Sequence, residues 1–223
     1  MKLWLFGTYA WQGNPKALFL YMTKKCSSSH ECWWIADNQD DMKSIKKATG
    51  LENVTYQGSQ KSSDLFAKAD VYVTENFRES YPVEMNENIK IFNTWHGVGL
   101  KHIELALGMD SVLADSIVRK YIRNYSLYQN NTLFLTTSQV MEDHFLEDMA
   151  ISKDLIVRGQ YPRNTVYKSG DIRTYQISDV LPNKQNQYND LILFAPTYRI
   201  GAIEGVLNYL LPDFDKIEES CRK

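Results

Sequence analysis

Residues 2–7, Lys2-Leu3-Trp4-Leu5-Phe6-Gly7, and residues 14–19, Asn14-Pro15-Lys16-Ala17-Leu18-Phe19, together decide the fold class of this chain. The first stretch is apolar and short, which is typical of a buried strand and too short for a membrane span or a signal-peptide core. In the second, Asn14 is a capping residue before a proline at the first helical position, so a helix is predicted to run through Met22. A buried strand that leads into a helix is the opening of an α/β domain.

The same alternation continues along the chain. Helices are predicted at Asp40–Thr49, which closes on Gly50, at Ser111–Tyr128, and at Gln139–Met149 after the capping residue Ser138. Further strands are predicted at Cys32–Ala36, Val71–Thr74, Ile89–Asn93, Leu133–Thr137, Leu155–Val157 and Leu191–Ala195. Several of these runs are unbroken in their apolar character, which favours a parallel sheet covered on both faces. A Rossmann-like α/β domain is therefore predicted.

Composition narrows the class of protein and of partner. The chain has 223 residues, 43% of them hydrophobic and 23% charged, which is typical of a soluble globular protein. A net charge of -2 provides no field that would attract nucleic acid. Three cysteines are too few for a disulfide framework and indicate a reducing compartment, so the cytoplasm is expected. Cys26, His30 and Cys32 lack a fourth ligand nearby, and neither a metal site nor a cofactor is predicted.

A polar stretch, Thr174–Asp190, separates the predicted domain from the end of the chain. It lacks hydrophobic periodicity and is typical of a linker. We therefore expect a first domain at residues 1–185. Residues 186–223 are expected to hold linker, one strand and the start of one helix at Asp213–Lys223, which is the incomplete opening of a second domain.

The segment predicted at Ser111–Tyr128 has an amphipathic pattern. Its apolar positions are Leu113, Ile117, Tyr121, Ile122, Tyr125 and Tyr128, and Arg119, Lys120 and Arg123 lie largely opposite. Such a helix allows a weak peripheral contact with a membrane, and an ordinary solvated helix face is the simpler interpretation.

The strongest candidate for chemistry is Ile91–Lys101, which reads Ile-Phe-Asn-Thr-Trp-His-Gly-Val-Gly-Leu-Lys. A strand is predicted to stop at His96 and to turn through Gly97 and Gly99 into a helix. Ligands of open α/β sheets bind outside the carboxyl ends of strands. A histidine there can act as a general base, and the glycines let the backbone approach a ligand closely. A histidine satisfied inside the core beside a tight turn is the alternative.

Two further segments end in groups suited to phosphate. Leu191–Arg199 is an apolar run that delivers Thr197 and Arg199 at its end, and the guanidinium fork of arginine matches phosphate oxygens. In Val157–Thr165, a strand leads through Gly159 and Pro162 to Arg163 and Asn164 at a helix start, where free amides attract anions. A surface arginine and a capped turn are the respective alternatives. Motifs of serine hydrolases, P-loop enzymes and classical dinucleotide oxidoreductases are absent from the sequence.

Taken in order, these segments resemble the CDP-glycerol glycerophosphotransferase family, which builds teichoic acids and related capsule polymers. The resemblance covers nearly the whole chain. It is carried by Trp4-Leu5-Phe6-Gly7 with Asn14–Phe19, by Asn93-Thr94-Trp95-His96-Gly97 with Leu100-Lys101, by Gly159-Gln160-Tyr161-Pro162-Arg163-Asn164, and by Ala195-Pro196-Thr197-Tyr198-Arg199.

The resemblance implies a two-domain GT-B fold, with this chain as the acceptor-side domain and the second domain truncated. It implies that His96 deprotonates an acceptor hydroxyl of a polyol phosphate or saccharide. That hydroxyl then attacks the phosphorus bearing the alditol of CDP-glycerol or CDP-ribitol and expels CMP. Arg199 and Thr197 match the family's loop near the donor phosphates, and Arg163 and Asn164 match the loop that closes the front domain. Family members work at the inner membrane surface.

The sequence also departs from the family pattern. Thr165 stands where the family has an acid after Arg-Asn, and Val98-Gly99 stand where it has Thr-Pro. The family's second essential histidine and its serine and aspartate donor contacts would lie beyond Lys223, so we expect the chain alone to lack turnover. Two alternatives stay open: a non-catalytic module that binds acceptor or a partner, and a GT-B glycosyltransferase that uses a nucleotide sugar.

Overall fold

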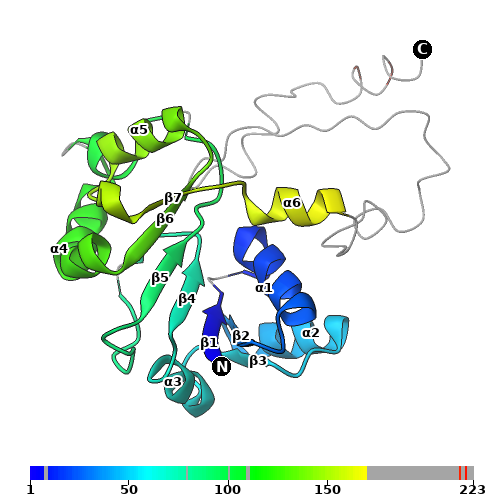
Figure 1. The fold of residues 1–223 in the computed structure, drawn as a ribbon. Helices are drawn as coiled ribbons and strands as arrows, with labels where there is room; N and C mark the ends of the chain where they lie inside the picture. Colours follow the sequence, from blue (N-terminus) through cyan, green and yellow to red (C-terminus); the bar gives the residue numbers. More distant parts are fainter. Residues whose placement is uncertain are drawn as a thin grey trace. The chain divides into compact units, whose positions relative to one another are not determined.

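The computed structural model describes residues 1–7, 10–78, 80–99, 101–108 and 111–169, together with residues 216 and 219. Within these residues seven strands form one parallel sheet in the order β3-β2-β1-β4-β5-β6-β7 (Figure 1). The strands are β1 Lys2–Phe6, β2 His30–Ala36, β3 Val54–Tyr56, β4 Val71–Thr74, β5 Lys90–Asn93, β6 Thr132–Thr136 and β7 Ile156–Arg158. The predicted Rossmann-like parallel sheet is confirmed. The short strand β3 was not predicted, because three residues carry too little pattern.

Helices cover both faces of this sheet. The α-helices are α1 Gly13–Lys25, α2 Gln39–Thr49, α3 Gln60–Phe66, α4 Ala114–Asn130, α5 Gln139–Asp148 and α6 Pro162–Ser169. Buried side chains of α1 and α2 pack with Phe6, Trp34 and Val73 on one face, and α6 packs against α1. Those of α3, α4 and α5 pack on the other face, against residues that include Ile91 and Phe134. The core therefore consists of two apolar layers on the two sides of the sheet.

Helix ends confirm two of the predicted caps and correct a third. The Ser138 hydroxyl accepts from the amide of Met141 at 3.3 Å, and Gly50 ends α2 with a φ of 70°. Helix α1 begins one residue before Asn14, and its N-cap residue Gln12 makes no side-chain cap. The prediction that Asn14 caps this helix is wrong, because its side chain bonds other segments instead.

The segment after His96 also differs from the prediction. The expected helix is absent from the described part of this loop, which runs to a short 3₁₀ helix at Glu104–Leu107. Two glycines close together disfavour a helix. In addition, the buried Asp148 carboxylate of α5 accepts a hydrogen bond from the backbone amide of Ile103 at 2.8 Å. This bond holds the loop backbone against α5.

Helix α4 turns a narrower apolar face to the core than predicted. Ile117, Tyr121 and Tyr128 are buried, whereas Ile122 and Tyr125 are 74% and 58% exposed and Leu113 is also exposed. The buried residues form one stripe at helical spacing, and the exposed ones flank it. In the described residues, no helix is both long and apolar enough to cross a bilayer.

Candidate functional site

The order of the strands marks one place on the sheet where a ligand can enter. Chain connections run from β1 toward β2 and from β4 toward β5, so the direction of winding reverses between β1 and β4. In open α/β sheets the crevice lies at such a switch point, beside the carboxyl ends of the strands. Figure 1 shows the arrowheads of β4 and β5 directed toward the neighbouring first turns of α1 and α6.

His96 is placed by the strained residue before it. Trp95 is buried against Phe134 and Phe145 and has a φ of 50°, a left-handed conformation that is rare for a bulky residue. Strain of this kind persists only where packing enforces it, and it is frequent at functional sites. The kink turns His96 outward, and its ring stacks on the Trp95 ring with 4.3 Å between centroids. The imidazole is therefore held and yet exposed.

The hydrogen bond of His96 selects one tautomer. Nδ1 lies 3.1 Å from the backbone carbonyl oxygen of Glu75, at the end of β4. A carbonyl oxygen can only accept, so Nδ1 must carry the proton that it donates. In the neutral ring this leaves the lone pair on Nε2. A neutral imidazole with a held Nδ1–H and a free Nε2 is the form that a general base requires.

Glu75 brings a buried carboxylate to the same place. The backbone amide of Asn14 donates to it, and Oε2 has no hydrogen-bond partner among the described residues. Burial raises the pKa of this carboxyl above its ordinary value, while the Asn14 amide and the nearby His96 and Arg163 oppose that shift. Gly13 lies against the carboxylate with a φ of 72°, and a side chain there would collide with it.

The side chain of Asn14 joins three segments at this point. Its Nδ2 donates to the Trp95 carbonyl at 2.7 Å, and its Oδ1 accepts from the amide of Arg163 at 3.3 Å. Asn14 is completely buried. The start of α1, the kink before His96 and the start of α6 are therefore tied together by one carboxamide.

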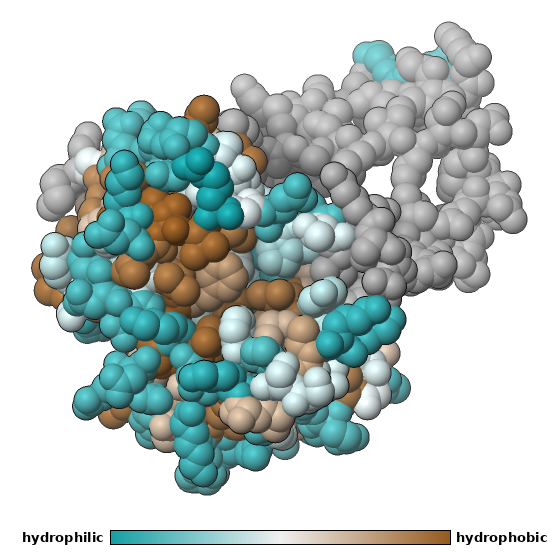
Figure 2. Space-filling view, in the orientation of Figure 1, coloured by the Kyte–Doolittle hydropathy of each residue, from teal (hydrophilic) through white to brown (hydrophobic). Residues whose placement is uncertain are grey.

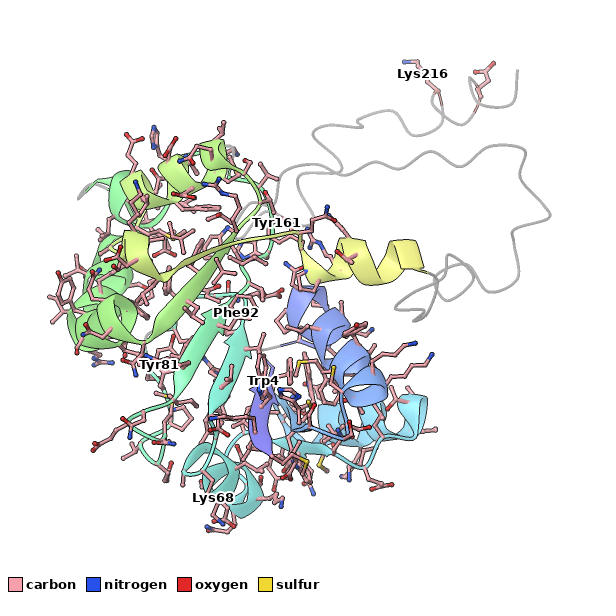
Figure 3. The ribbon with its side chains drawn as sticks, viewed as in Figure 1. Trp4, Lys68, Tyr81, Phe92, Tyr161 and Lys216 are labelled. Atoms are coloured by element: carbon pink, nitrogen blue, oxygen red, sulfur yellow. The ribbon has the colours of Figure 1, made fainter. Side chains whose placement is uncertain are left out.

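Tyr161 closes the other side of this arrangement. Its hydroxyl donates to the Gly97 carbonyl at 2.5 Å, and Figure 3 shows Tyr161 where the chain leaves β7 and enters α6. Burial raises the pKa of this phenol, so it stays a donor at neutral pH. The loop that follows His96 is thus attached to the α6 start.

The predicted site residues fall into three groups. His96, Gly97 and the start of α6 with Arg163 and Asn164 come together, and both of these α6 side chains are exposed. Gly99 lies against the His144 ring. Thr197 and Arg199 lie outside the described residues, as do the strand predicted at Leu191–Ala195 and the boundary expected after residue 185.

The α6 start differs in one respect from the anion site expected there. The amide of Arg163 is taken by Asn14, and the amides of Asn164 and Thr165 both donate to the Tyr161 carbonyl. The backbone amides of Arg163 and Asn164 are therefore already used. Their side chains, rather than these backbone amides, are available to a phosphate.

Sequence reasoning missed Glu75 and the role of Asn14. Glu75 directly follows the apolar run Val71–Thr74, so an acid at the carboxyl end of a predicted strand was a usable signal. Asn14 was noticed only as a cap. In the described part of the chain, no group of three or more His, Cys, Asp or Glu side chains could hold a metal ion.

Comparison with known proteins adds a family and a fold. A model of the family described as CDP-glycerol:poly(glycerophosphate) glycerophosphotransferase matches residues 2–221. No curated protein gives a match. Among solved structures, the chain is 18% identical to the wall teichoic acid polymerase TagF in a histidine-to-asparagine variant with CDPG. That match covers 100% of this chain and 54% of that one, with a TM-score of 0.71.

A histidine-to-alanine variant of TagF is also similar, with 18% identity, a TM-score of 0.66, and coverage of 98% of this chain and 53% of that one. The chain thus spans about half the length of the solved structures that it matches. At this identity the likeness shows the fold alone, which is the GT-B-like fold that was predicted.

The tautomer of His96 can be measured directly. In long-range ¹H–¹⁵N NMR spectra of the neutral ring, we expect Nδ1 to carry the proton and Nε2 to be unprotonated, because the Glu75 carbonyl can only accept. His96→Gln identifies the resonances among those of the other three histidines. The opposite tautomer in the folded chain would contradict the assignment.

Replacing Glu75 tests its burial through the pH dependence of stability. Since the folded-state pKa is raised, this group's contribution is full below the ordinary value of 4.5 and is lost as pH rises through the raised value. The Glu75→Gln side chain cannot ionise. The free energy of unfolding of this variant should therefore increase, relative to that of the wild type, as pH rises. Urea denaturation at a series of pH values measures this.

Glu84→Gln is the matched control, because Glu84 is exposed. Its stability curve should run parallel to that of the wild type. A Glu75→Gln curve that is also parallel would refute the raised pKa.

Proposed function

This chain belongs to the CDP-glycerol:poly(glycerophosphate) glycerophosphotransferase family, and on that premise we propose that it takes part in moving an alditol phosphate from a CDP-alditol to an acceptor hydroxyl, with His96 as the base. One observation carries the base assignment. The bond from Nδ1 of His96 to the Glu75 carbonyl leaves Nε2 unprotonated in the neutral ring, which supports a role as a base near the carboxyl ends of the strands.

In the proposed reaction, Nε2 of His96 takes the proton of the acceptor hydroxyl. The acceptor oxygen forms a bond to the phosphorus that bears the alditol. The bond from that phosphorus to the bridging oxygen breaks, and its electron pair leaves with CMP. His96 becomes an imidazolium, and the nearby Glu75 carboxyl group favours that charge when it is ionised. Positioning and charge neutralisation supply most of the catalysis in such transfers.

Phosphate oxygens need cations, and the α6 start offers one. We assign the exposed Arg163 guanidinium and the side-chain amide of Asn164 to phosphate groups near His96. Gly97 has open space where a side chain would stand, which leaves room for the acceptor hydroxyl. Thr197 and Arg199 keep their proposed role at the donor phosphates on the strength of the family resemblance.

The donor is proposed to be CDP-glycerol, with CDP-ribitol as the alternative, and the acceptor a polyol phosphate or saccharide. The family description names CDP-glycerol and poly(glycerophosphate), and the TagF structure with CDPG agrees with that donor.

Measuring product release from CDP-glycerol, CDP-ribitol and nucleotide sugars separates these cases. CMP from a CDP-alditol supports the proposal, and turnover of a nucleotide sugar would make the protein a glycosyltransferase. Acceptor binding without any turnover would make it a binding module.

Replacing His96 tests the base. In the protein expressed from the complete gene, His96→Ala should lower the rate of CMP release by roughly 10²–10⁴-fold, because proton removal from the attacking hydroxyl is lost. His30→Ala is the matched control, since His30 begins β2 at the opposite end of the strands. A His96→Ala protein with wild-type turnover would remove His96 from this role.

We also propose a peripheral contact of α4 with the inner face of the cell membrane, from the cytoplasmic side. Ile122 and Tyr125 are exposed on this helix together with Arg119 and Arg123. Figure 2 shows hydrophobic residues gathered in the part of the visible face that lies between α5 and α4. Ile122→Ser should weaken cosedimentation with anionic lipid vesicles, while Val83→Ser, at an exposed valine outside α4, should not. Equal binding by both variants would contradict this contact.

A further inference from the structure

A pocket of about 340 Å³ lies apart from the His96 site, between Ala10 and Trp11, the carboxyl end of β2 and helix α2. Its size is within the range of small-molecule sites. Buried Trp34, Ala36 and Ile45 form its apolar bottom, and the exposed Asp37, Asp41 and Ser44 surround it. Trp11 forms a wall, with its ring perpendicular to that of Trp34 at 4.6 Å between centroids.

Strand order separates this pocket from the proposed reaction. It sits at β2, and three strand spacings of the order β2-β1-β4-β5 lie between it and the strand that leads to His96. That corresponds to roughly 14 Å across the sheet. None of the residues that line it contributes to the site around Asn14, Glu75 and His96.

The charges of the pocket disfavour an anion. Its described lining contains two aspartates and no lysine or arginine, and the nearby Lys16, with Nζ 5.1 Å from the centroid of the Trp11 ring, is buried. Arg78 is close enough to interact with Asp37, but its guanidinium donates to the Tyr72 hydroxyl at 3.0 Å and to Gln57 at 3.2 Å. The Asp37 oxygens can therefore accept hydrogen bonds from a neutral ligand.

The fold explains which donors those oxygens would meet. In dinucleotide-binding sheets, an acid at the end of the second strand holds ribose hydroxyls, and the phosphates sit at the start of the first helix. Asp37 directly follows β2 and so corresponds to the acid that holds ribose hydroxyls. At the start of α1, however, the Glu75 carboxylate already takes the Asn14 amide. The part that binds a diol is present, and the part that binds phosphate is occupied by the Glu75 carboxyl group.

We propose that this pocket binds a neutral saccharide ring. Vicinal hydroxyls of the ring donate to Asp37 and Asp41, and its apolar C–H groups contact the parts of Trp11 and Trp34 that line the pocket. This inference does not depend on the proposed transfer reaction, because the two sites share no residue.

Binding is measured on the ¹⁵N-labelled chain through the indole N–H resonances of Trp11 and Trp34. The probes are the methyl α-glycosides of D-glucose, D-galactose and D-mannose, with glucose 6-phosphate as the charged counterpart. At least one glycoside should give saturable shifts with a Kd on the order of 1 mM, as expected for a ligand of this size. Glucose 6-phosphate should bind more weakly, since the aspartates repel it.

Two conservative variants make the test specific. Asp37→Asn should weaken binding about tenfold, because a charge-assisted hydrogen bond is lost. Asp40→Asn is the matched control: Asp40 lies at the same helix start but outside the lining, so its variant should bind like the wild type. The proposal is overturned if no glycoside gives saturable shifts up to about 100 mM. It is equally overturned if glucose 6-phosphate binds as well as the glycosides, or if Asp37→Asn leaves binding unchanged.

Discussion

The buried side-chain carboxamide of Asn14 bonds the kink before His96 to the start of α6. The backbone amide of Asn14 donates to the Glu75 carboxylate. Each partner comes from a different part of the chain, and the bonds form only when β1, β4 and β5 lie side by side. A buried polar group left unsatisfied is costly, so these bonds constrain one another. The candidate site depends on this constraint more than on any single strand or helix.

The same constraint sustains strain at the site. Trp95 adopts a left-handed backbone that a bulky residue avoids in isolation, and its ring is held in the aromatic core by Phe77, Phe134 and Phe145. Asn14 holds its carbonyl from the other side. The result is an exposed histidine with a defined tautomer, whose Nε2 is unprotonated in the neutral ring.

Glu75 affects which ligand groups could bind at the start of α1. Its carboxyl group lies at the helix start where a Rossmann-like protein would bind a phosphate. The exposed Arg163 and Asn164 are the residues proposed to hold phosphate instead. The sheet thus keeps the geometry of a nucleotide-binding fold while its α1 start serves to hold a carboxylate beside the histidine.

The sequence by itself determined the alternation of strands and helices, the parallel sheet, most strand positions and His96 at a strand end. These follow from local apolar runs, caps and glycines, which act over a few residues. Tertiary structure alone decided what Asn14, Glu75 and Tyr161 do, because their partners lie 21 to 149 residues away in sequence. It also decided how narrow the buried face of α4 is and that a loop follows Gly97, since long-range packing outweighs local pattern there.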